Sequence, residues 1–595
     1  MMLFSRIQTI DLILIKFQIL ICGNFAKPVC KFKSSDTVKS KTKEEMASHS
    51  KTKSNYKSLM KKGFFEIAAT LLHRVKSTSQ LSDEEQVLYD MCLCRLSFLP
   101  PIDLTNDYCR ILSTSQSIDQ SMAPIVAEQI LRHLKSKMFN HKHSKLLEYF
   151  AGNELFTLYL QSFFNVDISI EHKIRELRTT ILDLSNDVFS CNASYYNLAV
   201  SLAIQACHSD YILDISEDEL GKLATLEHEC REKETDDYFE KTCFIKLAMY
   251  LPPTENLKQK FNSINSKTKV ERKLSQHIDE RLDYLGDANT VPLLFSRGNI
   301  KERAPVTEVK SQYENYPFPR WSNVLTSKSK RTFREHMEHR ESSNKSISVP
   351  DNIDILVAGC GTGKHVISLA ERYYYSTITA IDFSATSLKY ARMKVDRATY
   401  PDIEFYQADI LELTNWERQF HLIESVGVIH HTIDPIRTLK VLVDLLNQGG
   451  WMKIGVYSRL ARRYIEFARQ VIAEENFSDD IEGMRAFRNF VLKSRETSDL
   501  RKLIHYADFY NTNHLKDLAF NACEKVFDIP QLKAMLELLG LEFRGFQLDN
   551  KRHLSKYRSI FPEDQAGINL DNWASFETEN PDTFIGMYQF WCKKK

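Results

Sequence analysis

The chain has 595 residues, enough for two to four domains at about 150 residues per domain. Charged residues make up 26% of the chain, close to the globular average of about 25%, which excludes a wholly disordered protein. The 79 Lys and Arg side chains and the 78 Asp and Glu side chains leave a net charge of +1, so bulk charge gives no argument for a nucleic-acid partner. With 18 glycines and 16 prolines, the chain is poor in turn-forming residues, which favours a helix-rich protein.

Residues 1–54 are predicted to form a disordered or basic tail. Asp11, Lys16 and Gln18 interrupt its apolar stretch, which is too short to span a membrane. Mitochondrial or secretory targeting is the less favoured alternative, and Met46 offers another start, which would make the preceding residues a gene-model extension. Twelve scattered cysteines lack the spacing of a zinc site and indicate reduced thiols. We expect a cytoplasmic protein with no membrane span and no metal.

Residues 55–300 are predicted to form an α-helical domain. Apolar residues recur every three or four positions in segments such as FFEIAATLLHRV, APIVAEQILRHL and NLAVSLAIQACHSDYIL. No clean 34-residue repeat signature is present, so an irregular helical domain is favoured, with a repeat-like domain as the alternative. We expect this half to recognise the substrate or a protein partner.

Residues 301–350 are predicted to be a linker with two parts. VTEVKSQYENYPFPRW predicts a short helix that runs into an aromatic segment with two prolines, and SKSKRTFREHMEHRESSNKS predicts a linker or an exposed helix. Aromatic faces stabilise cations, so the aromatic side chains of the first part could form a lid over a cationic ligand. The alternative is that they pack the helical domain against the next domain. These side chains are Tyr313, Tyr316, Phe318 and Trp321.

After residue 351 short apolar runs alternate with helical segments, as in IDILVAGC, HVISLAERYY and STITAID. This alternation predicts an α/β domain over residues 351–595 with a mostly parallel, Rossmann-like sheet covered on both faces. A helical insert is expected at about 459–525. The final strands, LEFRGFQL and TFIGMYQFWC, are expected to pair antiparallel at the edge of the sheet, because no helix is predicted between them.

The string VAGCGTGKH lies where the first predicted strand meets a helix. Its glycines at 359, 361 and 363 allow a sharp turn and bring the backbone close to a ligand. A dinucleotide fingerprint has the spacing G-x-G-x-x-G, with pyrophosphate at the helix N-terminus. The spacing here is G-x-G-x-G, which disfavours a nicotinamide-dependent oxidoreductase and suits a ligand without pyrophosphate.

Two carboxylates follow the next two predicted strands. Asp382, 19 residues after Gly363, ends the second strand and is placed to accept hydrogen bonds from both ribose hydroxyls. Asp409 ends the third strand and is placed to receive an adenine amino group. Ribose and adenine without pyrophosphate describe S-adenosyl-L-methionine, although each carboxylate could instead cap a helix or lie at the surface.

The segment from Ile353 to Ser458 resembles a class I S-adenosylmethionine-dependent methyltransferase. The segments QYENYPFPRW, GVIHHTIDPIRTLKVLVDLL and GGWMKIGVYSRLARRYI are similar to the tetratricopeptide-repeat-containing methyltransferases, as are the later stretch from Asp508 to Leu536 and the closing MYQFWCKK. The larger family often has an acidic residue where this chain has Val357, but Val before GCGTG is ordinary in that set. The resemblance implies a seven-stranded sheet whose last strand is antiparallel. It implies the following cofactor-binding residues: Ala358, Gly359, Cys360, Gly361, Gly363, Asp382, Phe383, Asp409, Ile410 and Gly427.

The catalytic and acceptor-binding residues are less well defined. The run ESVGVIHHTIDP stands where the family's fourth strand lines the methyl-transfer face, so His430 and His431 are candidate general bases, with Tyr457 as a further catalytic candidate. Substrate contacts are expected after the fifth strand. The candidates there are Asp508, Tyr510 and His514. Structural packing is the alternative for each of these side chains.

The function predicted from the sequence is methyl transfer from S-adenosyl-L-methionine to an unidentified protein, RNA or small-molecule acceptor. The enzyme need not supply a nucleophile, because aligning the acceptor with the methyl group and its leaving sulfur contributes about 7–11 kcal/mol. The alternative is a non-catalytic scaffold that keeps a degenerate methyltransferase fold.

Overall fold

A computed structural model gives the structure of this protein. The residues that it describes are 56, 59–60, 65–78, 80–114, 118–137, 143–232, 237–255, 258–259, 261, 267–285, 292–294, 304–321, 330–341, 349–398, 400, 402–548 and 551–595. The predicted tail, residues 1–54, lies outside them. The chain divides into two compact units, residues 1–93 and residues 94–595.

The first unit contains helices α3 (Phe65–Thr78) and α4 (Asp83–Leu93). Ser82 and Glu85 cap the start of α4 reciprocally: the Glu85 N–H donates to the Ser82 hydroxyl (3.4 Å), and the Ser82 N–H donates to the Glu85 carboxylate (3.0 Å). The two helices pack on each other through apolar side chains such as Leu72 and Tyr89, both fully buried.

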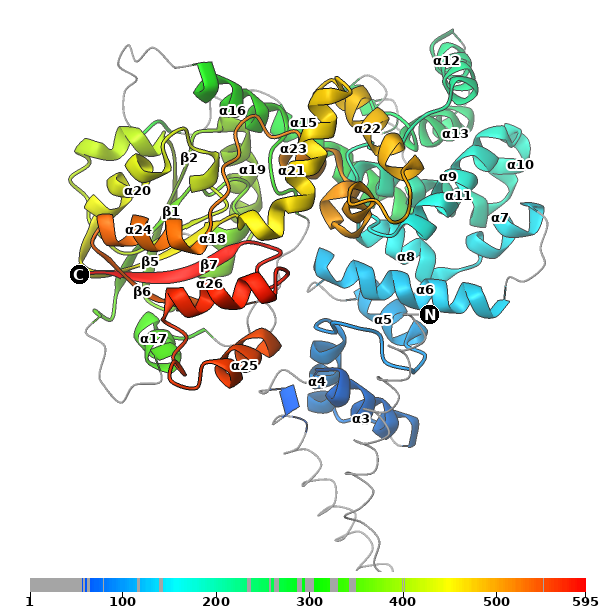
Figure 1. Cartoon of the computed structure of the whole chain (residues 1–595). Coiled ribbons are helices and arrows are strands. Elements are labelled where there is room, and N and C mark those ends of the chain that lie inside the picture. The colour runs from blue at the N-terminus through cyan, green and yellow to red at the C-terminus, as the bar shows by residue number, and fades with distance from the viewer. Residues whose placement is uncertain are drawn as a thin grey trace, which may run out of the picture. The chain divides into compact units, whose positions relative to one another are not determined.

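The second unit begins with a helical region, shown in blue to green in Figure 1. Its helices are α5 (Thr105–Thr114), α6 (Ala123–Lys137), α7 (His143–Ala151), α8 (Glu154–Ser162), α9 (Ile168–Asp183), α10 (Asn186–Cys191), α11 (Ala193–His208), α12 (Glu217–Glu232), α13 (Asp237–Ala248) and α15 (Lys269–Leu285). Helix α11 packs against α7, α8, α13 and α15, and residues 198–207 are all buried. A helix that is buried on all sides forms the centre of a helical layer. The N-terminal helical region was therefore correctly predicted.

The segment between the helical region and the sheet holds α16 (Ala304–Asn315) and α17 (Phe333–Glu341). Between them, residues 317–321 form a segment without helix or strand that we call the strap. Helix α17 was predicted as a linker or an exposed helix, and this was wrong, because Phe333 (1% exposed) and Met337 (0%) are part of the core on one face of the sheet. Two apolar residues four positions apart in a charged helix are too few to reveal its buried face from the sequence.

The sheet has seven strands in the order β3-β2-β1-β4-β5-β7-β6. Strand β7 pairs antiparallel with both β5 and β6, and the other neighbouring pairs are parallel. The predicted mostly parallel, Rossmann-like sheet with an antiparallel last strand is confirmed. The strands are β1 (Ile353–Ala358), β2 (Ser376–Asp382), β3 (Ile403–Gln407), β4 (Phe420–Val426), β5 (Leu446–Val456), β6 (Leu541–Phe546) and β7 (Tyr588–Lys594).

Helices cover both faces of the sheet (Figure 1). One face carries α17, α18 (Lys364–Ala370) and α19 (Ala385–Ala398). The opposite face carries α20 (Pro435–Asp444), α24 (Ile529–Leu538), α25 (Lys551–Ile560) and α26 (Leu570–Glu579). Helices α25 and α26 connect β6 to β7, where no helix was predicted. The apolar faces of these helices are short and consist largely of buried aromatic side chains such as Tyr557 and Trp573, so the sequence shows no helical pattern there.

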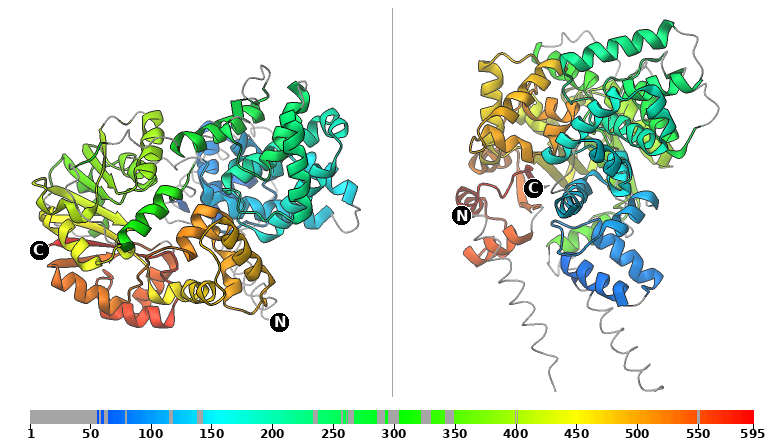
Figure 2. Two further views of the ribbon diagram at one scale, coloured as in Figure 1. Left: turned by 90° about the horizontal axis from the view of Figure 1, so that it is seen from above. Right: turned by 90° about the vertical axis from the view of Figure 1, so that its right-hand side faces the viewer.

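The segment predicted as a helical insert contains α21 (Arg459–Glu474), α22 (Ile481–Lys493) and α23 (Thr512–Ala519). Figure 2 shows these helices, in gold, beside helices of the helical region that begins the second unit. A buried ion pair joins Arg488 on α22 to Glu171 on α9 at 2.6 Å, with both side chains about 1% exposed. The insert therefore ties the sheet domain to the helical region. Among the described residues, no helix combines the length and apolarity that a membrane span requires.

Candidate active site

A cavity of about 610 Å³ lies at the carboxyl ends of the central parallel strands. Its walls include residues 359–361 after β1, Asp382 after β2 and residues 426–428 at the end of β4. Strand order reverses between β1 and β4, and open parallel sheets bind ligands at such a switch point. The volume falls within the range of about 300–1,000 Å³ that small-molecule sites occupy. This cavity is therefore the candidate active site.

The glycine loop, residues 359–363, requires glycine for two reasons. Gly359 and Gly361 have φ values of 77° and 50°, in the left-handed region that side chains disfavour. A Cβ at Gly361 would lie 2.7 Å from the carbonyl oxygen of Phe318, and one at Gly359 would lie 2.3 Å from a methyl group of Val428. The loop thus lies between the strap and the end of β4, with no room for a side chain at Gly359 or Gly361.

Backbone hydrogen bonds fasten this loop to the end of β2. The N–H groups of Gly359 and Cys360 both donate to the carbonyl of Ile381 at 2.9 Å. The Gly361 N–H donates to the Asp382 carboxylate at 2.8 Å. The position of the loop and the orientation of Asp382 are therefore set together.

The Asp382 side chain is 7% exposed and faces the cavity. Its second oxygen accepts the Ser384 N–H at 2.9 Å. Burial raises the pKa of the Asp382 carboxyl to about 6 and nearby Glu314 adds to the rise, while the Ser384 and Gly361 N–H groups oppose it. A carboxylate oxygen can accept more than one hydrogen bond, so Asp382 can still receive ribose hydroxyls.

Asp409 caps the 3-10 helix at Ile410–Asn415 by accepting the Leu411 N–H at 2.9 Å. Asp409 also lines the cavity, beside the apolar side chains of Phe383 and Ile410. Carboxylates for hydroxyl and amino groups, apolar walls for a flat base and the exposed backbone of a glycine loop together fit a nucleoside. The site residues thus fit S-adenosyl-L-methionine.

Most residues predicted to bind the cofactor line the cavity, and two do not. Ala358 is fully buried in β1. Gly363 is the N-cap of α18, where a Cβ would lie 2.8 Å from that of Ala391. The predicted residues that line the cavity are Gly359, Cys360, Gly361, Asp382, Phe383, Asp409, Ile410 and Gly427.

The two adjacent histidines have different environments. His430 is fully buried and does not line the cavity, and its ring lies against Tyr457 with centroids 4.0 Å apart. Burial lowers the pKa of His430 well below its usual value. His431 lines the cavity, and its Nδ1 lies 2.7 Å from the carbonyl oxygen of Cys523. A carbonyl only accepts, so Nδ1 carries the hydrogen and neutral His431 has its lone pair on Nε2.

The Nε2 atom of His431 lies 3.9 Å from the Asp517 carboxylate. Asp517 accepts the Tyr313 hydroxyl at 2.6 Å and the Asn521 amide at 3.0 Å, and both Asp517 and Tyr313 line the cavity. Burial, and then the Asp517 charge, raise the pKa of Tyr313 well above its usual value. The Asp517 carboxylate is therefore held by two donors 3.9 Å from the His431 nitrogen that carries the lone pair.

Tyr457 lines the same part of the cavity and lies under a buried guanidinium. The Arg462 Cζ is 3.8 Å from the centre of the Tyr457 ring. Arg462 forms a two-pronged ion pair with Glu524, with one contact at 3.0 Å. Burial raises the pKa of Tyr457. The Tyr457 hydroxyl therefore keeps its proton at neutral pH.

The remaining candidates divide in the same way. Asp508 lines the cavity, and it hydrogen-bonds to His514 at 2.8 Å, while His514 lies behind it. Tyr510 is buried and donates to the carbonyl of Ile504. In the strap, Phe318 lines the cavity but Trp321 does not.

The other lid candidates differ in the same respect. Tyr313 faces the cavity, whereas Tyr316 does not line it. The Tyr316 ring lies 5.7 Å from the Lys516 ammonium.

Three charged residues of the cavity wall were not predicted from the sequence: Lys364 at the start of α18, and Arg462 and Asp517 in the insert. The only signal for Asp517 is its spacing of three residues from His514, which places both side chains on one face of α23. Arg462 follows Ser458, which N-caps α21, by four residues and carries no motif. Both become part of the site only when the insert folds back over the ends of β4 and β5.

Comparisons with known proteins agree with this geometry. Residues 355–450 match the family model described as "Methyltransferase domain". An uncharacterized protein of Synechococcus sp. is 31% identical over 208 residues, which cover 32% of this chain and 48% of that protein. The ubiquinone biosynthesis O-methyltransferase of Paracidovorax citrulli is 26% identical over 112 residues, which cover 19% of this chain and 46% of the enzyme. The chain thus spans about half the length of these two relatives.

Among solved structures, PKMT2 from Rickettsia typhi in complex with AdoHcy aligns at 15% identity. The alignment covers 44% of this chain and 52% of that chain, with a TM-score of 0.35. The assignment of the fold therefore depends on the strand order and on the match to the family model.

Proposed function

We propose that this chain, which contains a class I S-adenosylmethionine-dependent methyltransferase domain, transfers the methyl group of S-adenosyl-L-methionine to a hydroxyl or amine of an acceptor. One observation carries the proposal. A single cavity joins the glycine loop and Asp382, which suit a nucleoside, to His431, which suits proton removal. Bound S-adenosyl-L-methionine supplies an electrophilic methyl group on a sulfonium.

On the cofactor side, the chain binds and orients. The Asp382 carboxylate accepts the ribose hydroxyls, and Asp409 receives the adenine amino group between the apolar walls of Phe383 and Ile410. The backbone of the glycine loop, at Gly359 and Gly361, lines the cavity and contacts the amino-acid part. These contacts fix the methyl group in line with the acceptor, and alignment is the largest contribution that such a protein makes.

On the acceptor side, His431 takes the proton. The acceptor lone pair forms the new bond to carbon, the sulfur keeps the pair of the bond that breaks, and Nε2 of His431 receives the acceptor's proton. The Cys523 carbonyl holds the tautomer that leaves Nε2 free of hydrogen, and Asp517 stabilises the imidazolium that forms. His430 has no part in this step, since it is buried away from the cavity.

Calorimetry with S-adenosylmethionine, S-adenosylhomocysteine and NAD tests the proposal. We expect the wild-type protein to bind the first two and not NAD. Asp382→Ala removes a charge-assisted acceptor and should weaken binding about tenfold or more. Asp351→Ala is a matched control, because that carboxylate is 81% exposed and precedes β1 at the opposite end of the strand.

If the wild-type protein binds none of the three ligands, the result contradicts the proposal and favours the non-catalytic scaffold. Binding of S-adenosylhomocysteine with equal affinity by wild type and Asp382→Ala would contradict the role of Asp382 alone. For the acceptor, the readout is transfer of labelled methyl to protein, RNA and metabolite fractions.

A further inference from the structure

The strap that covers the glycine loop is held from behind by a buried carboxylate of the helical region. Asp210 lies just after α11 and is 2% exposed. Asp210 and Tyr211 have φ values of 51° and 59°, a left-handed conformation that residues with side chains rarely adopt. Such backbone is kept only where surrounding contacts fix it. The turn after α11 is therefore built to place the Asp210 carboxylate.

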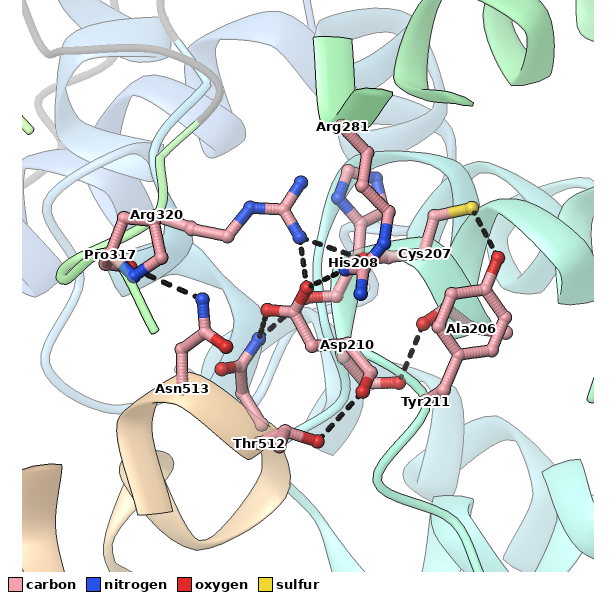
Figure 3. A network of polar contacts seen from close by, with 12 residues as sticks. Ala206, Cys207, His208, Asp210, Tyr211, Arg281, Pro317, Arg320, Thr512 and Asn513 are labelled. Atoms are coloured by element: carbon pink, nitrogen blue, oxygen red, sulfur yellow. Dashed lines mark hydrogen bonds and ion pairs between the residues drawn. The ribbon is translucent and has the colours of Figure 1, made fainter. Parts of the chain in front are cut away.

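Three chain segments converge on this carboxylate, as Figure 3 shows. One oxygen accepts the guanidinium of Arg281, from α15, at 2.6 Å and that of Arg320, from the strap. The other accepts the Asn511 amide, from the segment before α23, at 3.0 Å. We call Asp210 and these three partners the Asp210 hub. A buried charge is tolerated only when it is paired in this way, so the hub ties together the segments that it joins.

The strap has further contacts on the same side. The carbonyl of Pro317 accepts the Asn513 amide at 3.2 Å. The Thr512 hydroxyl donates to the Asp210 carbonyl at 2.7 Å, which keeps the insert next to the hub. The strap is thus held between the helical region and the insert (Figure 3).

The opposite side of the strap contacts the glycine loop. The Phe318 carbonyl occupies the position next to Gly361 that a side chain would need. The Thr362 hydroxyl donates to the carbonyl of Pro319, and the Trp321 indole N–H donates to the carbonyl of Thr362 at 3.0 Å. Phe318 and Pro319 also line the cavity. A shift of the strap would therefore move both a wall of the cavity and the loop that binds the cofactor.

We propose that Arg320 is a positioning residue: through the Asp210 hub it holds the strap against the glycine loop and so sets the affinity for the cofactor. This inference rests on the proposed function, because it concerns the affinity of the same site. It assigns to the helical region a role in forming the site. Arg320 itself does not line the cavity, so its effect is transmitted by Phe318 and Pro319.

The hub offers a matched pair of variants. Arg320→Ala and Arg281→Ala each remove one guanidinium from the same oxygen of Asp210, but only Arg320 belongs to the strap. We expect both to lower the melting temperature. Arg320→Ala should weaken S-adenosylhomocysteine binding about tenfold, a coupling of ordinary size between two sites, and Arg281→Ala should leave it within about twofold. Arg320→Lys keeps the charge and should give an intermediate affinity.

Calorimetry with S-adenosylhomocysteine measures the affinities, and hydrogen exchange of the peptide that contains residues 317–321 measures the strap. Faster exchange and weaker binding in Arg320→Ala but not in Arg281→Ala are the expected result. Equal affinities in the two variants, or wild-type affinity in Arg320→Ala, would overturn the inference. If Arg320→Ala does not fold, Arg320→Lys is the test. Wild-type affinity and wild-type hydrogen exchange in Arg320→Lys would then overturn the inference. Absence of binding by the wild-type protein would instead contradict the proposed function.

Discussion

The two ends of the cavity are built from different kinds of contact. At the cofactor end, the backbone of the glycine loop bonds to Ile381 and Asp382, which are close in the sheet and fixed by strand pairing. At the acceptor end, His431 depends on the Cys523 carbonyl, 92 residues away, and on Asp517. The cofactor end therefore follows from a local motif. The other is assembled only when the insert folds over the sheet.

The largest expected effect is at the acceptor end. His431→Gln should lower the rate of methyl transfer about 10²–10⁴-fold, the usual contribution of general base catalysis. S-adenosylhomocysteine affinity should stay at the wild-type value, because His431 is placed on the acceptor side. Single-turnover transfer of labelled methyl to the fraction that the wild-type protein labels measures the rate, and calorimetry provides the control. An unchanged rate would remove His431 from the mechanism.

At the cofactor end, Gly361→Val should lower the affinity for the cofactor, which His431→Gln leaves unchanged. Its Cβ would lie 2.7 Å from the Phe318 carbonyl oxygen, at a φ of 50° that a β-branched residue resists. We expect S-adenosylhomocysteine affinity to fall about 100-fold, through strain of a few kcal/mol at this position. The free energy of unfolding should fall by less than the free energy of binding does. Wild-type affinity in this variant would show that the loop does not bind the cofactor.

Most residues predicted at the cofactor end line one cavity, because the determinants of this end are close together in the chain and have distinct chemistry. Glycines at a fixed spacing after an apolar run, and acidic residues at the next two strand ends, can be recognised without knowing the fold. The acceptor end could not be predicted to the same depth. Choosing His431 over its neighbour requires burial and a hydrogen-bond partner that only the folded chain provides. The Asp210 hub gave no signal, because buried ion pairs between distant segments have no sequence pattern.

The ionisation of Asp382 should make the binding of S-adenosylhomocysteine at the cofactor end depend on pH. Its pKa is raised to about 6 by burial, so the carboxylate is ionised at pH 7.5 and mostly protonated at pH 5. If the ionised form accepts the ribose hydroxyls, S-adenosylhomocysteine affinity should fall about tenfold as the pH drops from 7.5 to 5, since one pKa unit corresponds to tenfold. Calorimetry at several pH values measures this slope.

Asp382→Asn should bind weakly with no such slope, because the amide does not titrate in this range. The same shift acts in the opposite direction on folding. A carboxyl whose pKa is raised in the folded state favours folding more at low pH, and this contribution is lost as the pH rises through about 6. A loss of affinity at low pH without a loss of stability would therefore come from the binding site. A slope that persists in Asp382→Asn would assign the titration to another group.

The smallest expected effect is at Gly221, a glycine whose replacement, unlike that of Gly361, should be tolerated. Gly221 lies in α12, where an added Cβ meets no atom within 4 Å and φ is not in the left-handed region. Gly221→Ala should therefore raise the free energy of unfolding by about 0.5–1 kcal/mol, because alanine loses less backbone entropy in a helix. Cofactor affinity should not change, in contrast to Gly361→Val. Urea unfolding and calorimetry on the same preparations measure both quantities. A destabilised Gly221→Ala would mean that α12 has a packing partner on this face, and a weakened affinity would mean that the cavity depends on more of the helical region than the strap and its hub.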